Sequence, residues 1–128
     1  MTFLLDTCTF LWLSDRTEEL SPKARELLVD GSNTLVLSQI SSIEIQIKFT
    51  KGKLPLRISP EEFVAESLER HGIQSLHLSD RHIWTTGKLP PIHHDPFDRL
   101  LVAQAIEESM VILTPDPKIH AYPVRTIW

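Results

Sequence analysis

Short apolar runs alternate along the chain with segments whose hydrophobic residues recur at helical spacing. The clearest runs lie at residues 3–5, 34–37 and 110–113, and weaker candidates lie at 74–78 and 124–127. In the clear runs apolar and polar residues do not alternate, as they would in a strand with one solvent-exposed face. The runs are therefore typical of a parallel sheet that helices cover on both sides. The pattern predicts an α/β fold, a three-layer α/β/α sandwich around a central parallel sheet with right-handed crossovers.

Capping residues mark where several of the helices begin. Three starts combine a capping side chain with a proline at the first helical position, namely Ser21-Pro22, Ser59-Pro60 and Asp95-Pro96. A fourth helix is expected to begin after Ser41 and to stop at Gly52. In that helix Glu44 takes the third helical position, where a capping box places a glutamate.

The length and charge of the chain narrow its class. With 128 residues and a net charge of −4, it fits one domain spanning residues 1–128 and is too acidic for a protein that simply coats nucleic acid. The first residues lack a basic segment, and the lone Cys8 cannot form an internal disulfide. No apolar run approaches the roughly 18 residues of a membrane span. We therefore expect a cytoplasmic protein.

One strip of the chain departs from the acidic balance. Residues 48–57 contain four basic residues and no acid, whereas the rest of the chain carries 9 basic and 17 acidic residues. Such a strip is suited to hold a polyanion at one place, although a solvated helix end has the same composition. The candidate contacts to phosphate are Lys48, Lys51, Lys53 and, at another helix start, Arg99. Lys48 also has a local explanation, since Glu44 lies one helical turn before it.

Acidic residues fall where the predicted strands end and helices begin. These residues are Asp6, Glu44, Asp98 and Asp116. In an open parallel sheet these places share one edge, where ligands bind. Each of the last three also has an ordinary local explanation, in a capping box, a helix N-terminus or a proline-flanked turn. Asp6 is harder to explain locally, because a carboxylate that ends a buried strand is costly unless something pairs with it.

Four carboxylates at one edge predict a cation. They repel one another, so some must stay protonated at neutral pH unless a cation neutralises them. Oxygen ligands favour Mg²⁺ or Mn²⁺, and the chemistry that fits is attack of water on a phosphate ester. The adjacent His93 and His94 do not predict a zinc site, because neighbours in a loop point in different directions and no third histidine lies at helical spacing. A turn leading to the cap at Asp95 accounts for them.

The acidic residues lie in motifs that resemble those of the PIN-domain nucleases, and more narrowly the VapC-type toxins of bacterial toxin–antitoxin pairs. The motifs are Leu4-Leu5-Asp6-Thr7, Ser42-Ile43-Glu44-Ile45, Asp95-Pro96-Phe97-Asp98-Arg99 with the following Leu100 to Ala105, and Thr114-Pro115-Asp116. The resemblance covers essentially the whole chain, and the segment around Asp98 is its most specific part. It implies a Mg²⁺-dependent endoribonuclease, often directed at transfer RNA, dimeric, and inhibited by a cognate antitoxin protein.

The resemblance also suggests a role for each site residue. Asp6 and Asp98 would bind the metal most directly, while Glu44 and Asp116 would complete its shell, through water where not directly, or orient the attacking water. Thr7 would hold a carboxylate through its hydroxyl. The metal would activate a water and neutralise charge that develops on the phosphate, and the products would carry 5′-phosphate and 3′-hydroxyl ends.

Two other classes of protein fit the sequence less well. A catalytically silent PIN-like domain would bind RNA or protein without cleaving, yet all four acids are present. A receiver-like signalling domain is also α/β, acidic and of this length. It needs a second acid near the end of the first strand and a lysine near the last one, and this chain has neither. The three tryptophans are expected in the core, or in a groove for a dimer partner or antitoxin.

Overall fold

The computed structural model describes all of residues 1–128 and contains a five-stranded sheet. The strands are β1 (Thr2–Leu5), β2 (Thr34–Ser38), β3 (Ile73–Leu76), β4 (Val111–Leu113) and β5 (Thr126–Ile127). Their order in the sheet is β3-β2-β1-β4-β5, and every neighbouring pair is parallel. The predicted parallel α/β fold is therefore confirmed.

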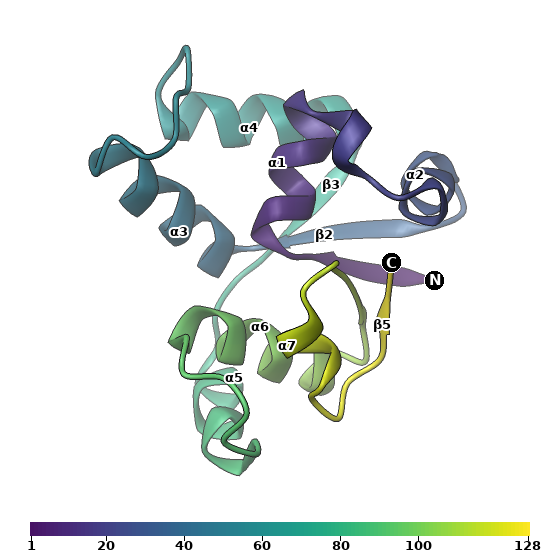
Figure 1. The fold of residues 1–128 in the computed structure, drawn as a ribbon, viewed down its shortest axis with the longest axis vertical. Coiled ribbons are helices and arrows are strands. Elements are labelled where there is room, and N and C mark those ends of the chain that lie inside the picture. The colour runs from purple at the N-terminus through teal and green to yellow at the C-terminus, as the bar shows by residue number, and fades with distance from the viewer.

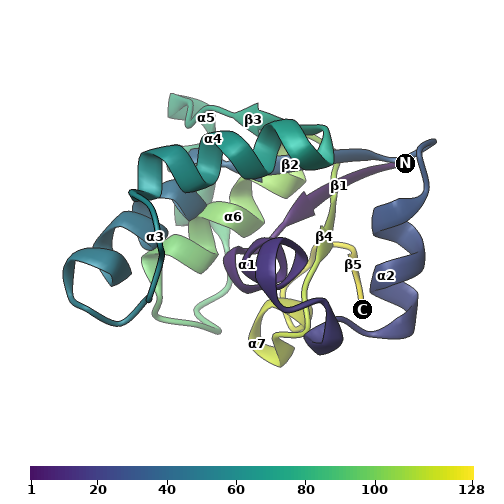
Figure 2. The ribbon, with the colours of Figure 1, turned by 90° about the horizontal axis from the view of Figure 1, so that it is seen from above.

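Helices lie on both faces of this sheet (Figures 1 and 2). They are α1 (Thr7–Asp15), α2 (Pro22–Val29), α3 (Gln39–Thr50), α4 (Pro60–His71), α5 (Asp80–Thr85), α6 (Pro96–Glu107) and α7 (Pro117–His120). One core cluster joins the sheet to α1, α2, α4 and Ile45 of α3, and a second joins it to α6, α7 and Ile40 of α3. In Figure 1, α1 and α4 are above the sheet and α5, α6 and α7 are below it. None of the helices is long and apolar enough to cross a membrane.

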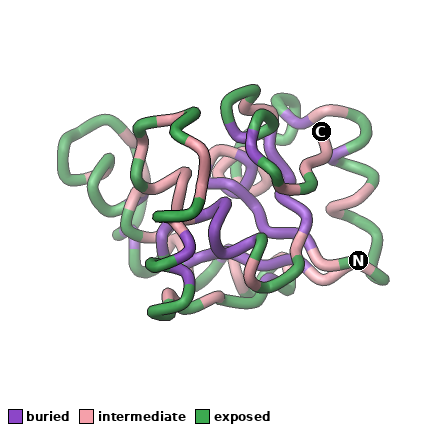
Figure 3. The backbone as a smooth tube through the Cα atoms, turned by 90° about the horizontal axis from the view of Figure 1, so that it is seen from below, coloured by how far each residue is buried: buried purple, intermediate pink, exposed green.

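The central strand β1 shows why the strands read as continuous apolar runs. Phe3 and Leu5 belong to the core on one face of the sheet and Leu4 to the core on the other, and all three are fully buried. Figure 3 shows this buried segment running through the middle of the molecule. A strand with helices on both sides needs no polar face, which is the pattern that the sequence shows.

The register of the strands brings their carboxyl ends to one edge. Leu5 is paired with Leu37 on one side and with Leu113 on the other. The residues that follow these strands therefore lie next to one another, and they include Asp6 and Thr114.

Most predicted helix starts are confirmed by their caps. The side chains of Ser21, Ser59 and Asp95 each accept a hydrogen bond from a backbone N–H in the first turn of the following helix. Gly72 ends α4 in the left-handed conformation, with φ of 63°, which costs glycine little.

The predicted start of α3 is wrong by three residues. Ser38, not Ser41, caps this helix, and its hydroxyl accepts the N–H of Ile40 at 3.0 Å. Ser41 lies inside the helix and is buried. Glu44 is thus in the second turn and not at the capping-box position, so the local explanation for a glutamate there does not hold.

Candidate active site at the carboxyl edge of the sheet

Asp6 is built into the junction between β1 and α1. It is buried, and its Oδ1 accepts the backbone N–H of Thr9 at 2.9 Å, which caps α1. Its Oδ2 accepts the hydroxyl of Thr114, the residue that follows β4. These hydrogen bonds satisfy a carboxylate that the apolar strand would otherwise leave costly to bury.

Thr114 also positions the next acid in the chain. Its Oγ1 accepts the backbone N–H of Asp116 at 3.0 Å, and Asp116 in turn caps the short helix α7 through the N–H of Lys118. The sequence indicated a turn here and not a helix, because four residues are too few to show a helical period. Asp6 and Asp116 are thus linked through one threonine.

Glu44 projects from α3 toward the first turn of α1. Its Oε1 lies 2.8 Å from the hydroxyl of Thr7, which is also 2.9 Å from the buried hydroxyl of Ser41. The pKa of Glu44 is raised from 4.5 to about 7, chiefly by burial. The charge on Asp98 acts in the same direction, while the hydrogen bond from Thr7 opposes both effects. The structure therefore places the Thr7 hydroxyl against a carboxylate, as expected.

Asp98 lies in the first turn of α6, three residues after the cap at Asp95. Burial raises the pKa of its carboxyl from 3.8 to about 6, with smaller contributions in the same direction from Asp95 and Asp116. The nearby His93 opposes this rise, since its Nε2 is 2.9 Å from Asp98 Oδ2. Asp98 raises the pKa of Glu44, and Asp95 and Asp116 raise that of Asp98, which is the repulsion expected of clustered acids.

The tightest group of possible metal ligands is His93, Asp98 and Asp116. One ligand atom from each of the three lies within 4.8 Å of the other two. Asp6 is not part of this group, although the resemblance gave it, with Asp98, the most direct contact to the metal. Sequence reasoning considered His93 only together with His94, as a zinc site that it rejected, and did not connect it with Asp98, five residues later.

These residues fit a divalent cation. Asp98 and Asp116 offer oxygen atoms to one shared space, and burial and repulsion raise the pKa of Glu44 to about 7 and that of Asp98 to about 6. A cation would relieve both costs, and carboxylate oxygens are the ligands that Mg²⁺ and Mn²⁺ prefer.

Lysines border the acidic cluster. A hollow of about 250 Å³ beside it is lined by Glu44, Ile47, Lys48, Lys51, Lys53, Asp95 and Phe97. The three lysines that the sequence singled out thus meet at one place, next to one of the candidate catalytic acids. A phosphate chain lying in this hollow would pass the carboxylates.

A model of the PIN domain family matches residues 3–124. The chain belongs to the PIN domain family. Solved structures share its fold across nearly their whole length. A chain of VapBC2 from Rickettsia felis, bound to a DNA fragment from their promoter, is 19% identical with a TM-score of 0.76, and the match covers 99% of this chain and 98% of that one.

Two further structures give the same picture. A chain of VapBC-1 from nontypeable Haemophilus influenzae is 18% identical with a TM-score of 0.63, and the match covers 99% of this chain and 97% of that one. A chain of FitAcB from Neisseria gonorrhoeae is 18% identical with a TM-score of 0.62 and coverages of 98% and 96%. No curated protein sequence is significantly similar to this PIN domain.

Arg99 is engaged inside this PIN domain rather than directed outward. Its Nη1 donates to the carbonyl of Pro90 at 2.9 Å and to the hydroxyl of Tyr122 at 3.1 Å. Its Nη2 donates to the carbonyls of Thr86 and Leu89 at 2.8 and 3.5 Å. Both terminal nitrogens are thus occupied by the protein, and the contacts do not support the expected phosphate-binding role.

Cys8 lies beside the acidic cluster of the PIN domain but is not activated. Its Sγ is 3.4 and 3.5 Å from the two carboxylate oxygens of Asp6. Burial, followed by the negative charge of Asp6, raises the pKa of the thiol. The thiolate needed for oxidation or metal binding is therefore disfavoured.

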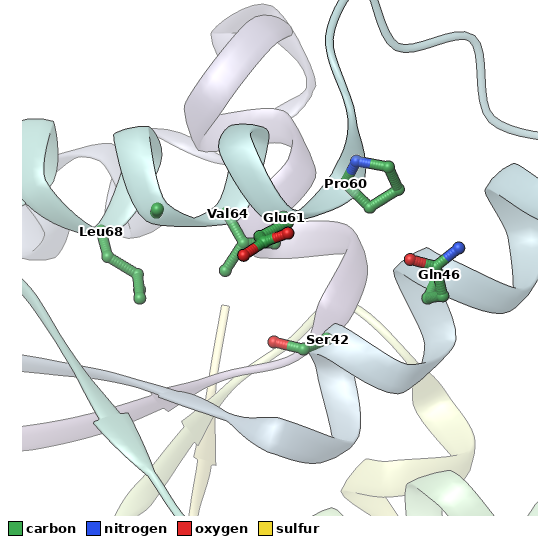
Figure 4. Close-up of a pocket in the computed structure, with 7 residues that line it drawn as sticks. Ser42, Gln46, Pro60, Glu61, Val64 and Leu68 are labelled. Atoms are coloured by element: carbon green, nitrogen blue, oxygen red, sulfur yellow. The ribbon is translucent and has the colours of Figure 1, made fainter.

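A second hollow lies between α3 and α4 (Figure 4). It measures about 310 Å³ and is lined by Ser42, Gln46, Pro60, Glu61, Val64, Ala65 and Leu68. None of the four predicted acids contributes to it, so it is not part of the candidate active site.

Proposed function

We propose that this PIN domain is a metal-dependent endoribonuclease, the toxin of a toxin–antitoxin pair. The observation that carries the proposal is the gathering of Asp6, Glu44, Asp98 and Asp116 at the carboxyl edge of the sheet. These residues come from distant parts of the chain, and burial raises the pKa of Glu44 and of Asp98, which a cation would offset. The substrate is RNA, with transfer RNA as the first candidate, as the resemblance implies.

Each residue of the site would have its own role in hydrolysis of a phosphodiester bond. Asp98 and Asp116 would hold a divalent cation, Mg²⁺ or Mn²⁺, with Asp6 near them. A cation held there supplies positive charge that offsets the phosphate and favours ionisation of the attacking water. Thr7 holds Oε1 of Glu44, which leaves Oε2 free to orient that water and accept its proton. The phosphorus–oxygen bond to the 3′-oxygen breaks, and that oxygen takes a proton from solvent water, which gives 5′-phosphate and 3′-hydroxyl ends.

The lysine-lined hollow is the proposed path of the RNA. Lys48, Lys51 and Lys53 supply positive charge beside Glu44 in a protein that is otherwise acidic. Contacts of this kind position the phosphate backbone without reading bases. The choice of RNA would then depend on its shape.

A cognate antitoxin is the proposed protein partner. The VapBC complexes share this fold, and the Klebsiella pneumoniae structure with 16% identity is itself a toxin–antitoxin complex. Several apolar side chains are exposed here, including Trp84 at 72% and Ile43 at 43%. Such residues are suited to a protein interface, either with the antitoxin or in a homodimer. A cytoplasmic location belongs to the same proposal.

The deciding experiment is cleavage of a labelled transfer-RNA pool by purified, antitoxin-free protein. Reactions contain Mg²⁺, Mn²⁺ or chelator, and Asp98→Asn and Asp6→Asn variants run beside the parent protein. Asp80→Asn is the matched control, because Asp80 is an exposed acid at the start of α5. Discrete, metal-dependent cuts that persist in Asp80→Asn and disappear in the site variants are expected.

The other outcomes are equally informative. Cleavage by a folded Asp98→Asn protein at the parent rate would contradict the assignment of the site. RNA binding that needs no metal, without cleavage of any RNA tested, would favour the silent PIN-like domain instead.

A further inference from the structure

The imidazole of His93 lies among the carboxylates but is not one of the four acids on which the proposed function rests. Its Nε2 is 2.9 Å from Asp98 Oδ2, and one of its ring nitrogens lies within 4.8 Å of ligand atoms of both Asp98 and Asp116. Neighbouring ligands of an octahedral ion at about 2.1 Å are about 3.0 Å apart. The pair formed by His93 and Asp98 therefore already has the spacing of two ligands on one ion.

The backbone of His93 is held in place from the other end of the chain. Its N–H donates to the hydroxyl of Tyr122 at 2.9 Å, and that hydroxyl lies 3.3 Å from its carbonyl oxygen. Arg99 donates to the same hydroxyl at 3.1 Å and stacks its guanidinium 5.9 Å from the centre of the Tyr122 ring. The hydrogen bonds to the buried Tyr122 therefore fix the backbone of His93, although this residue lies in a loop.

The two ring nitrogens of His93 have different surroundings. Nδ1 faces the backbone N–H of Asp95 at 3.5 Å, a long contact, whereas Nε2 faces the carboxylates. A neutral imidazole with its proton on Nδ1 would present the Nε2 lone pair to a cation. This tautomer gives up the long contact with Asp95 and a hydrogen bond donated from Nε2 to Asp98, and a shared ion would replace the second of these.

We propose that His93 is a ligand of the same ion as Asp98 and Asp116, and that its nitrogen makes the site select a divalent transition-metal ion over Mg²⁺. The proposal refines the proposed function, on which it rests for the presence of an ion. Mg²⁺ prefers oxygen ligands and retains its waters, whereas imidazole nitrogen binds first-row transition metals well. The proposed ligand set is a mixed one, where the sequence predicted oxygen ligands alone.

The test uses Mn²⁺ as the probe, because it is paramagnetic. Pulsed electron paramagnetic resonance of Mn²⁺ bound to the purified protein detects coupling to a directly bonded ¹⁴N. His93→Ala and His93→Gln remove the ligand, and glutamine still offers a side-chain N–H to Asp98. His94→Ala is the matched control, because the neighbouring histidine is exposed and lines a separate hollow. Competition titrations measure the Mg²⁺ affinity of the same proteins, and thermal unfolding without metal checks their folding.

The expected result is ¹⁴N coupling in the parent protein and in His94→Ala, and none in either His93 variant. Loss of the ligand should weaken Mn²⁺ binding by about tenfold or more while Mg²⁺ binding changes far less. Absence of the coupling in the parent protein, or its persistence in His93→Ala, overturns the proposal. Equal losses of Mn²⁺ and Mg²⁺ affinity also overturn it, since His93 would then only position Asp98.

The result also separates this inference from the proposed function. Mn²⁺ bound without nitrogen coupling, in a protein that cleaves RNA, contradicts the ligand role of His93 alone. A protein that binds no divalent ion contradicts both.

Discussion

Thr114 donates its hydroxyl hydrogen to Asp6 across 108 residues of sequence, joining the ends of β4 and β1. The same oxygen accepts the backbone N–H of Asp116. One buried side chain therefore contacts two of the four acids by hydrogen bonds.

Replacing Thr114 with valine should damage both stability and activity. Valine keeps the size and branching of threonine but removes the hydroxyl that donates to Asp6 Oδ2 and accepts the Asp116 N–H. The expected cost is about 1–3 kcal/mol in the free energy of unfolding. Urea unfolding of Thr114→Val and of the control Thr114→Ser measures this cost. We expect serine to retain most of the metal-dependent cleavage, and a Thr114→Val protein as stable and active as the parent would contradict the role.

The metal-free protein should become less stable as the pH rises from about 4 to about 7. The pKa of Glu44 is raised from 4.5 to about 7 and that of Asp98 from 3.8 to about 6 in the folded state. Over this range the folded protein binds more protons than the unfolded chain, so its free energy of unfolding falls as the pH increases. Urea unfolding in chelator at pH 5 and pH 7.5 tests the sign.

Two comparisons assign this pH dependence to the cluster. Glu44→Gln should flatten the curve, because glutamine does not titrate, and Glu61→Gln, at an exposed acid on α4, should not. Mn²⁺ should stabilise the parent protein more at pH 7.5 than at pH 5, because protons compete with the ion for the same carboxylates. A free energy of unfolding that rises with pH in the chelated parent protein would show that the two pKa shifts are not those of the folded state.

Arg99 should matter for stability rather than for RNA binding. Its terminal nitrogens donate to three backbone carbonyls and to Tyr122, so Arg99→Gln leaves several of these acceptors unsatisfied and should cost about 1–3 kcal/mol. Thermal unfolding checks this, and filter binding of RNA at a temperature where the variant is folded should show little change. If the variant is stable but binds RNA more weakly and with less salt dependence, Arg99 contacts RNA after all.

The sequence predicted what is local or periodic in this fold. β1 was found because a strand buried on both faces is apolar throughout, and α4 because Ser59 and Gly72 mark its two ends. The start of α3 was placed wrongly, because both Ser38 and Ser41 are able to cap a helix. The structure decides between them by a contact with Thr7, 34 residues before Ser41, which draws the second serine into the helix.

The acids of the site were predictable because each follows a strand or begins a helix, and parallel strands bring those places together. His93 was not, because its approach to Asp98 depends on the loop conformation that Arg99 and Tyr122 impose from α6 and from beyond α7. No local pattern encodes a contact between a loop and a tyrosine 29 residues later.

The lysines of the hollow beside Glu44 should account for a measurable part of the salt dependence of RNA binding. Replacing both Lys51 and Lys53 with alanine should weaken binding and reduce the slope of log K against log salt by about 1.4, if each releases one counterion from single-stranded RNA. The control is the double replacement of Lys23 and Arg25, two exposed cations on α2, which lies near the amino ends of the strands (Figure 1). Because both double variants change the net charge equally, a general loss of charge would flatten both slopes alike. An effect confined to the Lys51 and Lys53 variant supports binding of the RNA in the hollow. Equal effects in both variants would contradict it.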